Sequence, residues 1–310
     1  MVDNVRRRNS RPFSVCPLGP QPARFPVSHG RIMEIKVLGR LQVTVSGRSV
    51  VPGDPESRRV LALLALRADQ VVPTCLMAQE LWANGSPPGG DSRIVPHIAS
   101  IRRRLTETIR ASDAFGGGRV TGADLLVSTP SGYRLDSSGG VLDAREFERH
   151  IGAGYRAMAA GDAARAAERL SLALSLWSDD DALGDLELGP ALRAHTRRLH
   201  EARMTAVEQW AAIELQLGRH RERLVDLAEL TDRHITHQGL HRHYITALAR
   251  CGRTADALRV YERLGTALRH EGGAGLSPDL RRLRDRIVLH SPGPDGRAGA
   301  PTALPPSFAG

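Results

Sequence analysis

The sequence has a single lysine, and this shortage excludes two kinds of chemistry. Lys36 lies between Ile35 and Val37, whereas a phosphate-binding P-loop needs a lysine that follows glycine and precedes Ser or Thr. Nucleotide hydrolysis of the Walker type is therefore excluded, and a Schiff-base mechanism is not expected. All the remaining Lys/Arg positions are arginines.

Aromatic residues and cysteines are also scarce. Aromatic residues form 4% of the chain against 41% apolar residues, so its cores are expected to consist of Leu, Val, Ile and Ala, which suits helices. Cys16, Cys75 and Cys251 are scattered without C-x-x-C spacing, which predicts reduced thiols. With 310 residues the chain has room for two domains and terminal tails.

Long apolar runs are missing as well. The longest, residues 60–66, is far too short to span a bilayer, and the basic N-terminus is not followed by the apolar core of a secretory signal. These features predict a cytoplasmic protein without membrane contact. The net charge of the protein is +9, which makes nucleic acid a candidate partner. Association with the nucleoid is therefore expected.

Both ends of the chain lack hydrophobic periodicity. Residues 1–31 are rich in Pro and Arg, and we interpret them as a disordered basic extension; residues 291–310 are interpreted as a disordered tail. Met33 immediately precedes the first patterned segment, so translation can start at Met1 or at Met33. N-terminal sequencing of the native protein would decide between them.

Residues 32–136 carry the pattern of a small mixed domain. Alternating apolar and polar residues predict an antiparallel sheet with a turn at Ser46-Gly47, and residues 124–136 predict a hairpin with Pro130-Ser131-Gly132 in its turn. Three helices are expected between them, at 56–69, at 73–82 and around the stretch HIASIRRRLTE. The order of sheet, three helices and hairpin is that of a winged helix of the OmpR type.

Residues 141–290 predict helices throughout, with an internal repeat. Gly161, Gly218 and Gly252 each separate two helical patterns, and the last two glycines are 34 residues apart, the tetratricopeptide period. Glycine is expected there because the chain turns at little cost with a positive φ. An acidic loop, a long helix over 190–217 and a final helix over 277–290 complete an all-α helical-repeat domain. The predicted fold is therefore mainly α with a small α+β part.

The arginine-rich helix has an apolar side and a cationic side. Ile94, Ile98, Ile101 and Leu105 form one stripe that must face the core. A solvated face is the ordinary interpretation of such arginines, but their place in a winged-helix order favours contact with the DNA major groove. Ser100 and Arg103 are the expected base-edge contacts, and Arg104 and Arg58 the expected phosphate contacts. The predicted DNA-binding residues are Arg58, Arg93, His97, Ser100, Arg102, Arg103, Arg104, Thr129, Ser131 and Arg134.

Pro96 leaves two alternatives for this helix. Either the helix begins close to Val95, so that Pro96 lies in its first turn, or the helix starts earlier and is kinked at Pro96. The first alternative would remove Ser92 and Arg93 from the groove.

Other motifs do not point to an enzyme, a cofactor or a metal. Four histidines gather in HITHQGLHRHY, but no H-E-x-x-H motif or cysteine pair accompanies them. We interpret them as the exposed face of a repeat helix whose inward residues are Leu240, Tyr244 and Leu248. Residues 179–181 are acidic but lack the EF-hand glycine and closing Glu. Neither G-x-S-x-G nor a strand-borne G-x-G-x-x-G occurs.

Taken together, the order and spacing of several stretches resemble the Streptomyces antibiotic regulatory protein (SARP) family in its small form. The resemblance covers residues 33–290, about five-sixths of the chain. The matching stretches are VLGRLQVTVSGRSVV, SRRVLALLAL, LMAQELW, HIASIRRRL, STPSGYRLD, LDAREFERHI, LALSLW, LQLGRH, ITALARCGRTADALRVYERL and GLSPDLRRLRDRIV.

The resemblance implies an OmpR-like winged helix, 32–136, followed by a tetratricopeptide-like bacterial transcriptional activation domain, 141–290. It also implies an activator of a secondary-metabolite gene cluster that binds direct repeats near the −35 promoter element as side-by-side protomers. RNA polymerase, through its sigma and alpha subunits, would be the partner recruited. The competing hypothesis is a helical-repeat scaffold with a weak or non-specific DNA-binding domain, which Pro96 favours.

Overall fold

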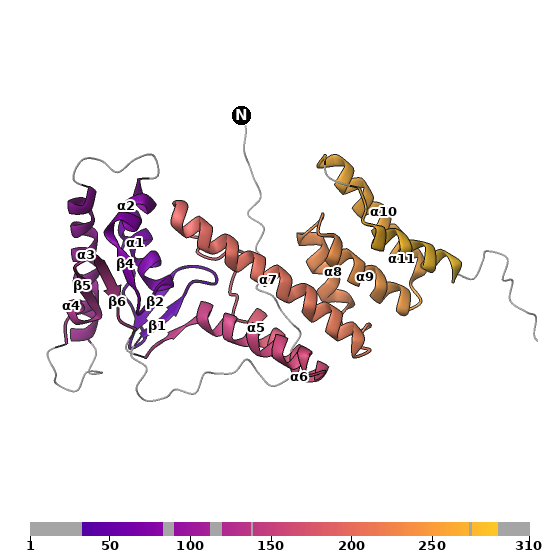
Figure 1. The fold of residues 1–310 in the computed structure, drawn as a ribbon, viewed down its shortest axis with the longest axis horizontal. Coiled ribbons are helices and arrows are strands. Elements are labelled where there is room, and N and C mark those ends of the chain that lie inside the picture. The colour runs from indigo at the N-terminus through magenta and orange to yellow at the C-terminus, as the bar shows by residue number, and fades with distance from the viewer. Residues whose placement is uncertain (1–32, 83–89, 112–119, 138, 273–274, 291–310) are drawn as a thin grey trace, which may run out of the picture. The chain divides into compact units, whose positions relative to one another are not determined.

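The computed structural model describes residues 33–82, 90–111, 120–137, 139–272 and 275–290 (Figure 1). The extension 1–31, the tail 291–310 and most of the two predicted loops after the second and third helices lie outside the described residues. The chain forms two compact units, Met1–Ile213 and Glu214–Gly310. Small sheets occur only in the described part of the first unit, and helices dominate both units.

The first sheet contains the predicted strands and one further strand. Met33 pairs with Val45 across an antiparallel ladder, and Ser46 and Gly47 have φ of 50° and 78° in the tight turn that follows. Met33 and Ile35 are 1% exposed, so the apolar side of the alternation faces the core. The strands, in spatial order, are β3 (Arg48–Ser49), β2 (Gln42–Val45), β1 (Met33–Lys36) and β7 (Val141–Leu142).

Three helices follow, as predicted. The Asp54 side chain accepts a hydrogen bond from the Ser57 amide. Pro55 occupies the first turn of the helix, where a backbone N–H has no partner within the helix, so the N–H that proline lacks costs no hydrogen bond. All residues from Val60 to Ala65 are buried. The helices are α1 (Pro55–Leu66), α2 (Thr74–Leu81) and α3 (Gly90–Arg110).

Pro96 lies inside α3, and the helix begins at Gly90. The alternative that the helix starts close to Val95 was therefore wrong. Ser92 and Arg93 remain helical, and both are exposed. The structure therefore agrees with the other alternative in its starting point, since α3 begins before Pro96 and continues to Arg110.

A second sheet contains the predicted hairpin. Gly132 follows its turn and lies so close to the neighbouring strand that a Cβ would be 2.0 Å from the Val72 carbonyl oxygen. Any larger residue would push these strands apart. The strand beside the hairpin and the short helix before it were not predicted. The elements are β4 (Val71–Pro73), α4 (Gly122–Leu125), β5 (Leu126–Thr129) and β6 (Gly132–Leu135), with β6 in the centre.

The remainder of the first unit is helical. α5 (Asp143–Ala159) packs against α6 (Ala163–Leu174), and the long α7 (Pro190–Gln216) follows after the acidic loop, as predicted. The buried rings of Phe147 and Trp177 meet edge to face at 5.6 Å.

Asp143 joins α5 to the first sheet. Its carboxylate accepts hydrogen bonds from the amides of Val37 (2.9 Å), Leu38 (2.9 Å) and Ala144 (2.7 Å). Burial raises the pKa of Asp143 to about 6, because the three amide bonds offset only part of the desolvation.

Glu80 makes a second junction, between α2 and the start of α7. The side chain is 1% exposed and accepts hydrogen bonds from the amides of Gly189 (2.5 Å) and Leu192 (2.9 Å). Gly189 immediately precedes α7 and Leu192 lies in its first turn, where amide donors have no partner within the helix. Glu80 therefore caps a helix more than a hundred residues further along the chain.

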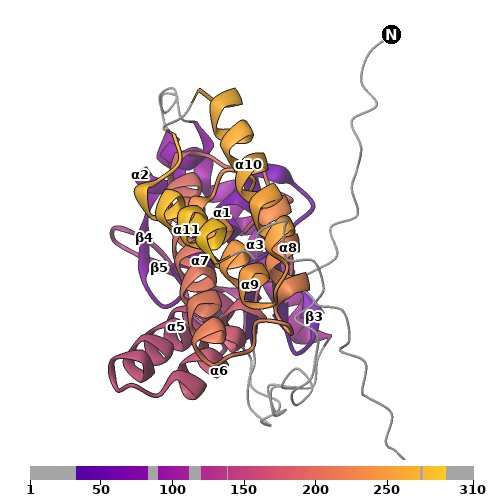
Figure 2. The ribbon, with the colours of Figure 1, turned by 90° about the vertical axis from the view of Figure 1, so that its right-hand side faces the viewer.

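The second unit forms its own core. α9, α10 and α11 pack against one another, and Figures 1 and 2 show them together. Leu248, Leu264 and Leu280 are completely buried among them. The helices are α8 (Leu224–Arg233), α9 (Gln238–Arg250), α10 (Thr254–His270) and α11 (Pro278–Leu289).

The glycine turns of the repeat are confirmed. Gly161, Gly218 and Gly252 have φ of +76°, +81° and +77°, and a helix ends two residues before each of them. One detail differs, since α8 begins only at Leu224, six residues after Gly218.

The prediction of an exposed histidine face was wrong. His241 and His243 are 1% and 7% exposed, and His237 instead caps α9 by accepting a hydrogen bond from the Leu240 amide at 3.3 Å. Burial, reinforced by Arg242, lowers the pKa of His243 to about 4, so the imidazole is neutral near pH 7.

The described residues include no group of three or more His, Cys, Asp or Glu side chains placed to hold a metal ion. Nor does any helix among them combine the length and apolar character that crossing a membrane requires.

Candidate nucleic-acid interface

The two sides of α3 are separated as the sequence predicts. Ile94, Ile98, Ile101 and Leu105 are at most 2% exposed and attach the helix to the core. The outward side is continuous and mostly cationic or small. Its exposed residues are Ser92, Arg93, Val95, Pro96, Ala99, Arg103, Arg104, Glu107 and Arg110, with Ser100 half-exposed beside them.

Three predicted contact residues are free to meet a ligand on this side. Arg93, Arg103 and Arg104 are all exposed, and within the described residues their one ion pair joins Arg104 to Glu107 at 3.9 Å. At that distance the pair is weak and restrains the guanidinium little. The outward face therefore presents several guanidinium groups along one side of a helix.

His97 is held by the protein instead. Its side chain is 15% exposed, and its Nδ1 lies 3.0 Å from the Ser57 hydroxyl. Carboxylate oxygens of Asp54 and Glu56 lie 3.4 Å and 3.3 Å from the ring nitrogens. His97 thus attaches α3 to the N-terminus of α1.

Arg102 fastens the hairpin to α3. Its guanidinium donates hydrogen bonds to the Leu126 carbonyl (2.9 Å from Nε and 2.6 Å from Nη2) and to the Ser128 hydroxyl (2.9 Å). It also lies over the Tyr133 ring, 5.8 Å from the centroid. Of the three consecutive arginines, one therefore faces the protein and two face outward.

The hairpin tip carries two of the predicted residues. Ser131 is exposed in the turn, and the Thr129 hydroxyl donates a 3.1 Å hydrogen bond to the Gly132 carbonyl that closes it. Arg134 lies two residues beyond Gly132 on β6, and Thr129 pairs with Gly132, so Arg134 is on the same face of the hairpin as Thr129. Because strand residues alternate, Arg134 is on the opposite face of the hairpin from Tyr133, which contacts Arg102.

Arg58 is also engaged within the chain. It forms an ion pair with Asp185, whose other oxygen accepts a 2.9 Å hydrogen bond from the Leu41 amide. An arginine with a part-buried carboxylate partner is not available to a phosphate without breaking that pair, so Arg58 belongs to the junction with the acidic loop.

The sequence reading missed three outward residues of α3. Arg110 extends the cationic face by two turns, and Val95 (52% exposed) and Ala99 form an apolar strip beside Arg103. Helical spacing was a sufficient signal for all three, because each lies away from the buried isoleucine stripe.

Comparison with known proteins gives consistent results over most of the chain. Residues 142–288 match the family model of the bacterial transcriptional activator domain. The regulatory protein DnrI of Streptomyces peucetius is 35% identical over 263 residues, which are 85% of this chain and 94% of DnrI. The transcriptional regulatory protein EmbR of Mycobacterium tuberculosis is 30% identical over 84% of this chain and 64% of its own length.

A solved structure of Mycobacterium tuberculosis EmbR, in complex with a low-affinity phosphopeptide, superposes with a TM-score of 0.70 at 29% identity. It covers 84% of this chain and 66% of the EmbR chain. The regulatory protein AfsR of Streptomyces coelicolor is 28% identical, and the chain spans 24% of its length.

Proposed function

This chain belongs to the Streptomyces antibiotic regulatory protein family of transcriptional regulators, and on that premise we propose that it activates transcription by sequence-specific binding to promoter DNA. In this proposal residues 32–136 are a winged helix of the OmpR type, with α3 as the recognition helix and the β5–β6 hairpin as the wing. The observation that carries it is the outward face of α3, where Arg93, Arg103 and Arg104 are exposed opposite a fully buried isoleucine stripe.

The contacts divide by position along the outward face. Arg103, at its middle, and half-exposed Ser100 beside it reach base edges, because an arginine fork matches the O6 and N7 acceptors of guanine. Arg93 and Arg104 flank them and contact phosphates, as does Arg110 at the end of the helix.

The remaining predicted residues act in other ways. Ser131 and Thr129 bring the wing to the backbone of a flanking groove. His97, Arg102 and Arg58 act as positioning residues through their protein partners. Arg134, on the same face of the hairpin as Thr129, is proposed as a further backbone contact of the wing.

The apolar strip adds a second kind of base recognition. Val95 and Ala99 are exposed beside Arg103, and small apolar side chains in the major groove contact the thymine methyl group. We therefore expect operator DNA in which uracil replaces thymine at the footprinted positions to bind about three- to tenfold more weakly. Ala99→Gly should reduce that difference, whereas equal binding of both DNAs by the unchanged protein would contradict it.

The helical remainder, residues 141–290, is proposed to supply the activating contacts. Support comes from the match of residues 142–288 to the bacterial transcriptional activator domain. We propose that side-by-side protomers on direct repeats near the −35 element present this domain to the sigma and alpha subunits of RNA polymerase. The regulated genes would form a secondary-metabolite cluster, and the protein would act in the cytoplasm on the nucleoid.

The test is a titration of the purified chain against promoter fragments from its own gene neighbourhood. DNase footprinting should show protected direct repeats upstream of at least one transcript, and in vitro transcription from that promoter should rise. Scrambled fragments of the same length should bind at least a hundredfold more weakly at moderate salt. Equal affinity for both DNAs would remove the specificity, and protection without increased transcription would remove the activation.

A further inference from the structure

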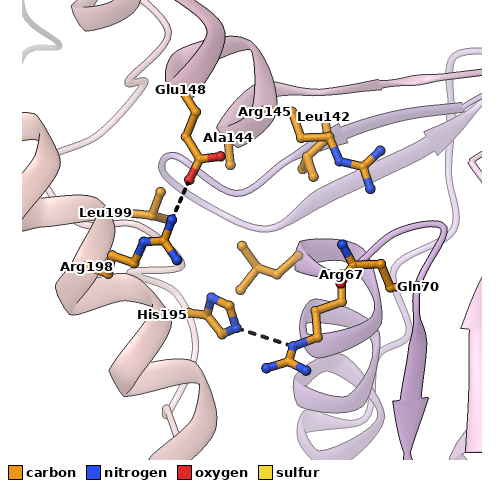
Figure 3. A pocket seen from close by; sticks show the side chains of 10 residues that line it. Arg67, Gln70, Leu142, Ala144, Arg145, Glu148, His195, Arg198 and Leu199 are labelled. Atoms are coloured by element: carbon orange, nitrogen blue, oxygen red, sulfur yellow. Dashed lines mark hydrogen bonds and ion pairs between the residues drawn. The ribbon is translucent and has the colours of Figure 1, made fainter. Parts of the chain in front are cut away.

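A cavity of about 350 Å³ opens between α1, α5 and α7 in the first unit (Figure 3). Arg67 directly follows α1, Arg145 and Glu148 come from α5, and His195 and Arg198 come from α7. Three guanidinium groups and an imidazole therefore line one space with a single carboxylate among them. None of these residues is part of the proposed DNA contact.

The positive charges in this cavity are incompletely compensated. Arg145 pairs with Asp69 at 2.8 Å, and Arg198 approaches Glu148 at 3.4 Å. Arg67 makes no ion pair within the described residues; its Nε reaches only His195 Nε2, at 3.4 Å. Arg67 therefore donates to an imidazole beside a second arginine. A partly enclosed guanidinium group usually has a carboxylate partner, which Arg67 lacks within the described residues.

The imidazole reports the same excess of positive charge. Burial lowers the pKa of His195, and Arg67 and Arg198 lower it further against a smaller opposing effect of Glu148. The ring is therefore neutral near pH 7. A bound anion would oppose both arginines and favour the imidazolium, which would then become a further donor.

We propose that this cavity binds a small, multiply charged oxyanion, bearing phosphate or carboxylate groups, between Arg67 and Arg198. Both guanidinium groups offer forked donors that match such oxygens. The volume is within the range of small-molecule sites. The lining residues come from the end of α1 and the residues after it, and from α5 and α7. An occupant would therefore connect the predicted 32–136 domain to the helices that follow it in the first unit.

Isothermal titration of the full chain, without DNA and at constant ionic strength, tests the proposal with pyrophosphate and with citrate as probes. At least one of the two probes should bind one site per chain. Arg67→Gln and Arg198→Gln should each weaken binding about tenfold or more. Glu148→Gln should tighten it several-fold, because a competing carboxylate is removed. Arg149→Gln is the matched control, an exposed α5 arginine outside the cavity, and should change nothing.

The gain from Glu148→Gln separates an anion site from a damaged fold, since structural damage would not strengthen binding. A second measurement follows the His195 ring by NMR, where a saturating probe should raise its pKa. The charged groups that face the ring are Arg67 just after α1, Glu148 on α5 and Arg198 on α7. If neither probe binds, or if binding is lost in Arg103→Ala but unchanged in Arg67→Gln and Glu148→Gln, the proposal is overturned while the DNA-binding proposal is unaffected.

Discussion

Replacing Arg103 and Arg104 together with alanine should weaken operator binding by about a hundredfold. Arg103 lies at the middle of the outward face of α3 and is assigned to a base edge, and Arg104 beside it is assigned to a phosphate. A forked guanine contact contributes about 1–3 kcal/mol, and each lost phosphate contact also reduces the counterions released. Quantitative gel-shift titrations over a range of salt concentrations measure both effects.

The single substitutions of the two arginines should have different effects on DNA binding. Arg103→Ala should reduce the preference for the operator over scrambled DNA. Arg104→Ala should lower the affinity for both DNAs alike, and it should reduce by about one the slope of log affinity against log salt concentration. Arg197→Ala, on the exposed surface of α7, is the matched control because it removes the same charge elsewhere. Unchanged operator affinity in the double variant would show that α3 does not read the DNA.

Glu80→Ala should lower the free energy of unfolding of the first unit by about 3–5 kcal/mol. The carboxylate is buried and accepts the amides of Gly189 and Leu192, so its removal leaves two buried donors without a partner and a cavity beside them. Urea denaturation followed by near-ultraviolet circular dichroism measures the change, with the slope of the transition checked for constancy.

Two variants keep this prediction specific. Glu187→Ala removes an exposed carboxylate from the loop just before α7 and should change stability by less than about 0.5 kcal/mol. Glu80→Gln retains one acceptor oxygen and should fall between the two. A loss in Glu80→Ala no larger than in Glu187→Ala would mean that water satisfies the start of α7 as well as the carboxylate does.

Local periodicity explains why so much of the fold was predictable. The isoleucine stripe of α3, the alternation in β1 and β2 and the positive φ at Gly161, Gly218 and Gly252 all follow from neighbouring residues. Each of these features depends on spacing within one or two elements, which is what a sequence displays directly.

The candidate site was less predictable because the role of each arginine and of His97 depends on a partner that is distant in the sequence. Arg102 contacts Leu126 across 24 residues, His97 contacts Ser57 across 40, and Arg58 contacts Asp185 across 127. Nothing in RRR distinguishes the inward arginine from the outward two until the hairpin is in place. Strands β4 and β7 were not predicted for the same reason. Both are short, and each pairs with a strand that is distant in the sequence.

The buried histidines show the same limit within the second unit. His241 and His243 occur in a polar stretch, so they were assigned to solvent, but α9 is covered on more than one side by α8, α10 and α11. A helix in the middle of a bundle buries more than one stripe, and composition alone does not reveal which helix is central.

Because Arg102 holds the hairpin to α3, the three consecutive arginines are not equivalent positions for engineering the proposed DNA preference. A lysine at position 102 would preserve the charge of the triplet but not the planar fork that grips the Leu126 carbonyl through two nitrogens. Libraries that randomise positions 103 and 104 should therefore yield altered specificities on an intact scaffold. Libraries that include position 102 should mostly yield variants in which the β5–β6 hairpin is less firmly held to α3.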